Sequence, residues 1–321
     1  MKKFVFLLVL AVLCCEGWSQ VDTRMRIAFW NVENLFDTRH DTLKSDEAFT
    51  PWGENHWTIK RYEDKRNKIF KVVAAMGWPA VLGMAEVEND RVLADLCKDT
   101  PLRKMGYEWV HYESPDRRGV DCAMIYRKDQ FKVLSSKAIC VSDSVEDFYT
   151  RDILMVHGMI NCSEKWDTCY LFVNHWPSKL GGVAADRHRL QIAQKLMQTM
   201  DSVRNCAEGA LVLAMGDLNA GPDEEAVYKG LGFGGGCENA LGFYNLTYQV
   251  PEGVGSYKYH DAWSCIDQMI CNWDLEFEVF APDFMLIDDQ KYLGKKLFRT
   301  YQGLRYQGGY SDHLPIIVTL P

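Results

Sequence analysis

The sequence lacks the features that mark several classes of protein. It has no internal repeat, no low-complexity tract, no Pro- or Ser-rich linker and no block of like charges. With 47% hydrophobic and 25% charged residues, the chain of 321 residues has the composition of an ordinary globular protein. This composition excludes a disordered, collagen-like or polytopic membrane protein. Because no linker marks a boundary, we expect one large α/β domain rather than two average ones.

Positive charge is also in deficit. The chain has 36 Lys and Arg against 44 Asp and Glu, which gives a formal net charge of −8. A chain of this charge without a basic run cannot hold nucleic acid by bulk electrostatics alone. Any phosphate-bearing substrate therefore requires a local site, and we expect a cation in it.

The cysteines do not occur in CxxC pairs, which excludes zinc-ribbon and thioredoxin-type proteins. Apart from Cys14 and Cys15, nine of the 11 cysteines remain, so at least one thiol per chain stays free. Cys162 and Cys169 flank a predicted hairpin turn and are the best disulfide candidate, provided that the protein reaches the oxidising conditions outside the cytoplasm.

The most continuous apolar run lies at the N-terminus. Two lysines precede the 12 apolar residues of Phe4–Cys15, which are too few to span a bilayer. The small residues Gly17 and Ser19 suit a signal-peptidase cut after Ser19. We therefore expect a signal peptide over residues 1–19, a single mature domain over residues 20–321, and export to the periplasm or out of the cell. A retained anchor would need a longer run, and the residues before the two cysteines of this run are poorly suited to lipoprotein anchoring.

Short apolar runs recur along the rest of the chain. Residues 61–76 and 186–203 carry apolar side chains at helical spacing and predict two helices packed on a core. Runs rich in β-branched, aromatic and aliphatic residues predict strands at 26–31, 80–86, 121–127, 153–160, 170–174, 210–215, 266–271 and 315–319. Strands separated both by helices and by hairpin-like turns predict a mixed sheet, or a pair of sheets, with helices outside.

Polar side chains follow four of these strand-like runs. They are Asn31 and Glu33, Glu86 and Glu88, Asn174 and His175, and Asp217 and Asn219. Because ligands collect at the carboxyl ends of strands in open α/β sheets, we expect these side chains to converge on one cleft. Carboxylate and amide oxygens suit Mg²⁺, Mn²⁺ or Ca²⁺, whereas the scarcity of His and Cys clusters argues against zinc. One such residue is usually a strand-end cap, but four coincidences indicate a site.

Six sequence blocks then occur in a fixed order. They are WNVENLFD (30–37), MAEVEN (84–89), VNHWPSK (173–179), GDLNAGPDE (216–224), IDQMI (266–270) and SDHLPI (311–316). Together they resemble the endonuclease/exonuclease/phosphatase superfamily, over about residues 26 to 319. The resemblance implies a deoxyribonuclease I-like fold, a four-layer α/β/β/α sandwich of two mixed β-sheets flanked by helices, with a metal-dependent phosphoesterase site at one end.

The resemblance also implies a metal site. Glu86 would be the principal ligand, with Asn31 close by and Asp312 beside the metal directly or through water. Glu33 stands where many members carry an acid, which gives it a supporting role, whereas Glu88 is better interpreted as a solvated or capping residue. Mg²⁺ suits such a site because it keeps several waters and needs only one or two carboxylates, with Mn²⁺ or Ca²⁺ as alternatives.

The catalytic residues implied by the resemblance centre on His313, which pairs with Asp267. A carboxylate in this position fixes the imidazole tautomer and stabilises its charged form. His313 would activate water or bind the phosphate as a cation, and the sequence leaves both uses open. Asp217 competes with it for the attacking water, while Asn219 and His175 would donate hydrogen bonds to phosphoryl oxygens.

A substrate rim is implied by basic and polar residues. Arg151 resembles an arginine that many members aim at a phosphate, and a surface ion pair with a neighbouring acid is an equal alternative for it. Ser178, Lys179, Arg187 and Arg189 cluster after His175, although arginines at a helix start are often only solvated.

The leading hypothesis for function is an exported nuclease, a monomer without a protein partner or stable membrane span, that hydrolyses phosphodiesters by in-line attack of water. Arg117 and Arg118 would add to a local basic edge. The loop aromatics Trp52, Trp57, Tyr257 and Tyr259 would stack on bases or simply pack their loops.

Two alternatives to a nuclease follow from the same residues. A lipid or small-molecule phosphodiesterase or phosphatase, sphingomyelinase-like or inositol-phosphate phosphatase-like, uses the same core. For a membrane-surface enzyme, residues 231–246 would supply the exposed apolar hairpin. A non-catalytic binding protein on the same fold is disfavoured, because every matched core position holds a chemically competent residue.

Overall fold

The computed structural model describes residues 24–143, 148–162 and 165–321. The predicted signal peptide lies outside these ranges and stays a prediction. Within these ranges, no helix combines the length and the apolar character that crossing a bilayer requires.

The first sheet has six strands and contains both chain directions. In spatial order they are β13 (Glu276–Val279), β18 (Ile316–Thr319), β1 (Arg26–Leu35), β2 (Val81–Val87), β4 (Asp121–Arg127) and β3 (Tyr107–His111). β1 and β2 run parallel, and all other neighbours run antiparallel. A parallel pair needs a long crossover, which the helix α1 (Ile59–Ala75) supplies.

The second sheet repeats this plan. Its six strands are, in spatial order, β5 (Phe131–Ile139), β6 (Ile153–Cys162), β7 (Lys165–His175), β8 (Leu211–Asp217), β12 (Asp267–Cys271) and β9 (Tyr244–Asn245). Only β7 and β8 are parallel within it, and they are joined through the long helix α3 (Gly182–Cys206).

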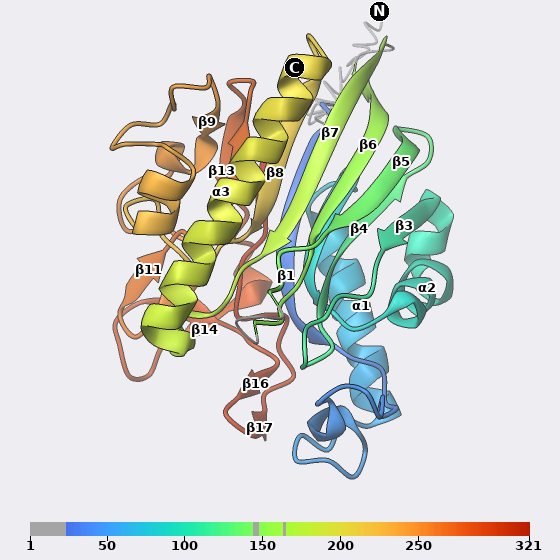
Figure 1. Ribbon diagram of the computed structural model, residues 1–321. Helices are drawn as coiled ribbons and strands as arrows, with labels where there is room; N and C mark the ends of the chain where they lie inside the picture. Colours follow the sequence, from blue (N-terminus) through green and yellow to red (C-terminus); the bar gives the residue numbers. More distant parts are fainter. Residues whose placement is uncertain (1–23, 144–147, 163–164) are drawn as a thin grey trace, which may run out of the picture.

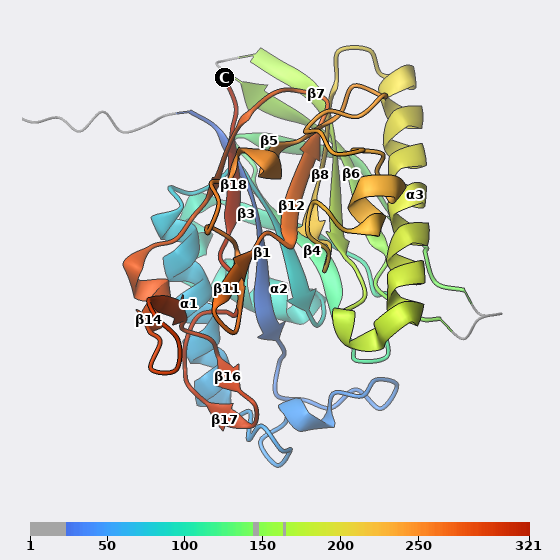
Figure 2. The same ribbon diagram turned by 90° about the vertical axis from the view of Figure 1, so that its left-hand side faces the viewer.

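The two sheets pack face to face, and helices cover their outer faces. Figure 2 shows α1 and α3 on opposite sides of the molecule with the strands between them. α1 packs on the first sheet through Ile69 and Val73, beside α2 (Asp90–Asp99), and α3 packs on the second through Ile192 and Leu196. The predicted four-layer α/β/β/α sandwich is therefore confirmed, and Figure 1 shows the same layers from another side.

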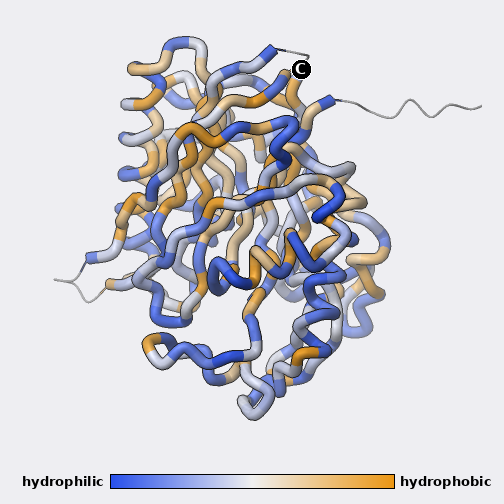
Figure 3. Tube along the Cα trace, turned by 90° about the vertical axis from the view of Figure 1, so that its right-hand side faces the viewer, coloured by the Kyte–Doolittle hydropathy of each residue, from blue (hydrophilic) through white to orange (hydrophobic). Residues whose placement is uncertain are grey.

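The inner core lies between the sheets. Phe29 and Met124 from the first sheet meet Val173 and Met215 from the second, and all four are fully buried. Gly83 permits this close approach, because a Cβ added there would lie 2.8 Å from Met215 Sδ. Figure 3 shows hydrophobic residues along the interior strands and hydrophilic residues over much of the outer loops.

Three short hairpins lie at one end of the sandwich. They are β10 (Tyr257–Tyr259) with β11 (Ala262–Ser264), β14 (Leu286–Asp288) with β15 (Lys295–Leu297), and β16 (Tyr301–Gln302) with β17 (Arg305–Tyr306). They lie near the end of the molecule that carries the polar cleft described below.

The disulfide expected between Cys162 and Cys169 is not formed. The register of β6 and β7 places Cys162 opposite Lys165, whereas Cys169 lies opposite Gly158. The four-residue offset corresponds to roughly 13 Å along a strand, beyond the reach of a disulfide. Both cysteines are free thiols.

Candidate active site

Polar side chains from both sheets converge on one cleft of about 930 Å³. The cleft lies where β1, β2, β7 and β8 end and where β12 begins. Its lining includes the following residues predicted from the sequence: Asn31, Glu86, Arg151, His175, Ser178, Lys179, Asp217, Asn219, Asp312 and His313. Strands from two packed sheets thus deliver to one place residues that lie far apart in the sequence.

Irregular backbone at the strand ends turns several of these side chains toward the cleft. The pairing of β1 with β2 shifts register between Asn31 and Leu35, and β2 shifts register again around Glu86. Glu86 has a φ of 63°, and Asn219, just after β8, has a φ of 47°. Such left-handed conformations are costly for residues other than glycine and gather at functional sites.

His313 and Asp267 form a buried hydrogen-bonded pair. His313 Nδ1 lies 2.8 Å from Asp267 Oδ2, and Ser256 Oγ donates to the same oxygen at 2.5 Å. Burial alone would lower the pKa of His313, but the negative charges of Asp267 and Asp217 hold it well above its usual value. With Nδ1 engaged, Nε2 is the imidazole nitrogen on the side of the cleft.

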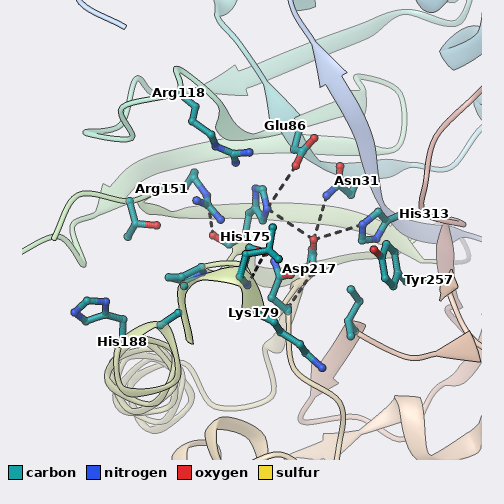
Figure 4. Close-up of a pocket in the computed structure, with 18 of the residues that line it drawn as sticks. Asn31, Glu86, Arg118, Arg151, His175, Lys179, His188, Asp217, Tyr257 and His313 are labelled. Carbon is teal, nitrogen blue, oxygen red and sulfur yellow. Dashed lines mark hydrogen bonds and ion pairs between the residues drawn. The ribbon is translucent and has the colours of Figure 1, made fainter. Parts of the chain in front are cut away.

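Asp217 lies at the centre of the cleft and contacts several of the other polar residues. Its Oδ2 accepts a hydrogen bond from Asn31 Nδ2 at 3.1 Å and lies 3.8 Å from His313 Nε2. Its Oδ1 accepts from the backbone N–H of Asn219 at 2.9 Å. Burial raises the pKa of Asp217 to about 7, although the charge of His313 acts in the opposite direction. Figure 4 shows Asp217 between His313 and His175, with the amide of Asn31 directed at the Asp217 carboxylate.

His175 lies between two acids. Its Nε2 is 3.7 Å from Asp217 Oδ2 and 3.9 Å from Glu86 Oε1. Burial, assisted by the nearby charge of Arg151, lowers the pKa of His175 well below its usual value. The two histidines of the cleft therefore differ, because burial lowers the pKa of His175 whereas the neighbouring carboxylates raise that of His313.

The residues expected to hold a metal fall into two groups. Glu86 and Asp312 line the cleft, and Glu86 Oε2 accepts from the backbone N–H of Asn34 at 3.0 Å. Glu33 does not line the cleft. Its two carboxylate oxygens accept from the backbone N–H groups of Thr300 and Tyr301 at 2.6 and 3.1 Å. Burial raises the pKa of Glu33 to about 7. Through these bonds the Glu33 carboxylate holds the segment before Asp312 in place. The predicted role of Glu33 at the metal stays a prediction.

Donor atoms of Asp217, Asp267 and His313 lie within 4.8 Å of one another. This spacing is compatible with a metal ion, but the close contact between His313 and Asp267 engages one atom of each. Asp312 forms an ion pair with Arg299, and this contact and the charge of His313 hold the pKa of Asp312 below its usual value against the effect of burial. The carboxylate oxygens that remain to face the cleft therefore belong to Glu86, Asp217 and Asp312.

The predicted substrate rim is only partly assembled. Arg151 is buried and donates to the carbonyls of His175 and Trp176 at 3.1 and 2.6 Å, and to Asp116 at 3.0 Å. The structure thus shows an ion pair for Arg151, but a buried one rather than the expected surface pair. Arg187 is exposed on α3 and does not line the cleft.

Two other rim residues stand at the cleft. Ser178 caps the short helix that follows it, accepting from the N–H of Leu180 at 3.4 Å, and Lys179 pairs with Glu224. Asn219, expected to face a phosphate, uses its side-chain N–H₂ on the carbonyl of Trp176 at 3.0 Å, which leaves one amide hydrogen.

Several residues that line the cleft have little in the sequence that marks them as part of a site. Arg118 reaches into the cleft beside Arg151 (Figure 4), and its basic character was the only sequence signal. Phe148 and His188 form a stacked pair on the wall, with ring centroids 3.6 Å apart. The tilted ring of Tyr257 lies 5.0 Å from that of His313. Two loops, the helix α3 and the strand β10 supply these residues, and no pattern along the chain predicts that these segments meet.

Comparisons with known proteins agree with this architecture. The Endonuclease/Exonuclease/phosphatase family matches residues 26–321 in sequence. No curated protein matches the chain.

Solved structures share the fold at low identity. A mannosyl-6-phosphatase of Bacteroides thetaiotaomicron is 15% identical with a TM-score of 0.59, covering 92% of this chain and 100% of that one. TDP2 of D. rerio complexed with a single-strand DNA product is 19% identical with a TM-score of 0.57, covering 93% and 99%. The human Nocturnin catalytic domain with bound sulfate is 16% identical with a TM-score of 0.56, covering 92% and 93%. At these identities the likeness shows the fold alone.

Proposed function

Because the chain belongs to the endonuclease/exonuclease/phosphatase family, we propose that it is a metal-dependent phosphodiesterase that hydrolyses nucleic acid. The observation that carries this proposal is the convergence of Glu86, Asp217 and Asp312 with the Asp267–His313 pair in one cleft. Metal-dependent phosphoester hydrolysis is the chemistry of this family, and the choice of nucleic acid as substrate is our proposal.

The residues of the cleft fit a divalent cation. Glu86, Asp312 and the amide of Asn31 offer hard oxygen donors, and several buried carboxylates in one cleft leave negative charge for a cation to balance. Mg²⁺ is our first choice, with Mn²⁺ or Ca²⁺ as alternatives. When bound, such an ion would neutralise charge on the phosphoryl group or on the leaving oxygen.

The proton-handling groups lie beside these ligands, since Asn31 contacts Asp217 and Asp312 Oδ1 lies 3.9 Å from His313 Nε2. Asp267 and Ser256 fix the imidazole of His313, so that its Nε2 is held toward the reacting group. Asp217 lies 3.8 Å from that nitrogen and is anchored by Asn31 and Asn219. In our proposal, one of Asp217 and His313 accepts the proton of the attacking water and the other stabilises the charge that develops.

Nucleic acid is favoured because the cleft is far larger than one phosphoryl group. Beyond the reacting centre, Arg118 and the stacked rings of Phe148 and His188 line its wall. A guanidinium suits a second phosphate and aromatic rings suit bases. One structural neighbour, TDP2, is named with a DNA product.

The lipid alternative loses its main support. Phe233 and Phe243, which would form an apolar membrane hairpin, are 1% and 0% exposed and pack under α3. A small phosphomonoester remains the second candidate, since a mannosyl-6-phosphatase shares the fold.

Side-by-side hydrolysis assays test the proposal. The purified protein would be assayed in Mg²⁺ with plasmid DNA, single-stranded DNA and RNA, mannose 6-phosphate, p-nitrophenyl phosphate and sphingomyelin. We expect cleavage of a nucleic acid with a much higher kcat/KM than that of either monoester. Release of inorganic phosphate from the monoesters without nicking or shortening of any nucleic acid would contradict the proposed substrate.

We also propose export, based on the predicted signal peptide over residues 1–19. Sequencing the N-terminus of the protein released from a bacterial host should find Gln20 first. A product that stays in the cytoplasm and retains residues 1–19 would contradict export.

A further inference from the structure

A second cavity of about 330 Å³ adjoins the cleft. The two share Tyr257, Tyr259 and Asp312, so the cavity begins directly beside the catalytic residues. The hairpins β10–β11 and β14–β15 and the segment that follows them form it. We call it the lysine cavity, and its principal residues are Tyr259, His260, Asp289, Lys291, Tyr292, Lys296 and Arg299, together with the buried Lys258.

The lysine cavity carries unbalanced positive charge. The ammonium of Lys258 is buried and lies 3.2 Å from Asp289 Oδ2, and Arg299 is paired with Asp312. Each carboxylate of the cavity thus has its own cation. Lys296, whose side chain is 31% exposed, is a second cation near Asp289, with its Nζ 3.9 Å from Asp289 Oδ1, and Lys291 is exposed. Four cations of the cavity therefore lie beside two carboxylates, which leaves an excess of positive charge. In a chain of net charge −8, this local excess points to an anionic ligand.

Aromatic rings line the same cavity. The rings of Tyr259 and His260 are stacked with centroids 4.2 Å apart, and the ring of Tyr292 lies 5.7 Å from that of His260. Tyr259 is 64% exposed and stands at the edge shared with the cleft. An exposed aromatic ring beside ammonium groups is the combination that binds single-stranded nucleic acid, by stacking on a base and contacting its phosphate.

We propose that the lysine cavity binds the nucleotide unit next to the scissile phosphate, with a base stacked on Tyr259 and a phosphate held by Lys291 and Lys296. This inference rests on the proposed function and extends it, because it requires a substrate longer than one phosphate ester. The nucleic-acid strand would then extend from the scissile phosphate in two directions. The cleft would hold one part of the strand along Arg118, and the lysine cavity would hold the other part.

Two substrates of different length test the inference. Bis-p-nitrophenyl phosphate supplies one diester without bases, and a single-stranded DNA dodecanucleotide reaches both cavities. In the Lys291→Glu/Lys296→Glu double variant, we expect the ratio of kcat/KM for the dodecanucleotide to that for the small diester to fall about 10-fold or more. The salt dependence of log kcat/KM should become shallower by about 0.7 for each phosphate that the variant no longer neutralises.

A matched control separates local contacts from net charge. Lys71→Glu/Lys104→Glu makes the same change of charge at two exposed lysines that line neither cavity, and should retain the wild-type ratio. Tyr259→Ala should lower the ratio about 5-fold or more, and Tyr259→Phe should restore it, because stacking needs the ring and not the hydroxyl. Circular dichroism would confirm that each variant is folded.

The outcomes distinguish this inference from the proposed function. Efficient cleavage of the dodecanucleotide by the wild type, with an unchanged ratio in the cavity variants or an equal fall in the control, would overturn the lysine cavity alone. A wild-type protein that hydrolyses the small diester but no nucleic acid would overturn the proposed substrate, and the cavity assignment with it.

Discussion

His313 Nδ1 lies 2.8 Å from Oδ2 of Asp267, and that oxygen also accepts a hydrogen bond from Ser256. The carboxylate therefore orients the imidazole, and its negative charge raises the pKa of His313 against the effect of burial. The replacement Asp267→Asn keeps the size of the side chain and removes the charge. We expect kcat to fall about 100-fold or more.

The control for this change is Ser256→Ala, which removes one donor but leaves the pair intact. It should cost far less activity than Asp267→Asn. Equal kcat values for Asp267→Asn and the wild type, measured on bis-p-nitrophenyl phosphate, would show that the pair has no catalytic role.

Glu86 is predicted to be the principal ligand of the cation. Mg²⁺ that binds only the folded protein should raise the melting temperature of the wild type as its concentration rises. In Glu86→Gln, which keeps the shape of the side chain, this increase should be reduced and turnover should be severely lowered. Thermal melts across a Mg²⁺ titration measure the effect without relying on catalysis. The same Mg²⁺-dependent increase in both proteins would remove Glu86 from the ligand set.

Lys65 ties α1 to the segment that carries Asp312. Its buried ammonium donates to Thr300 Oγ1 at 2.6 Å and to the carbonyl of Tyr310 at 2.7 Å. Because hydrogen bonds from a charged donor are strong, Lys65→Met should lower the free energy of unfolding by about 2–4 kcal/mol. Urea denaturation measures this, with exposed Lys71→Met on the same helix as a control that should change stability by no more than about 0.5 kcal/mol. Similar values for the two variants would refute the structural role.

The cysteines should differ sharply in reactivity. Burial raises the pKa of the thiols of Cys97 and Cys271 to about 12, whereas Cys140, Cys206 and Cys237 are exposed. Brief treatment of the native protein with iodoacetamide near pH 8 should therefore label the exposed group and spare the buried one. Peptide mass mapping reads each site, and urea should make all of them reactive. Rapid native labelling of Cys271 would contradict the packing of β12.

Much of the fold could be predicted because its strands and two of its helices carry clear periodic patterns. The helix α2 was missed, although Asn89 caps it by accepting from the N–H of Val92 at 3.1 Å and Leu93 and Leu96 face the core. This helix is short, and the acidic residues just before it, Glu86 and Glu88, are also typical of a metal site. The strand β5 was missed because its apolar residues do not alternate with polar ones, and of its side chains only that of Phe131 is buried.

The part of the site that lies at strand ends and in the six sequence blocks could be predicted. Asn31, Glu86, Asp217 and His313 meet in the cleft because packed strands deliver them there. Arg151 resembled a phosphate ligand, yet its guanidinium holds the backbone after β7, a distinction that depends on loop geometry. The lysine cavity had no pattern in the sequence, since separate hairpins build it.

The central claim is that this cleft performs metal-dependent hydrolysis of a phosphodiester. Its most direct test is the rate of hydrolysis of bis-p-nitrophenyl phosphate by the wild type and by His313→Ala, each before and after chelation and re-addition of Mg²⁺ or Mn²⁺. The account predicts that the wild type loses activity in chelator and regains it with the metal, and that folded His313→Ala stays about 100-fold or more slower throughout. Hydrolysis that is insensitive to chelator, or a wild-type rate in His313→Ala, would contradict it.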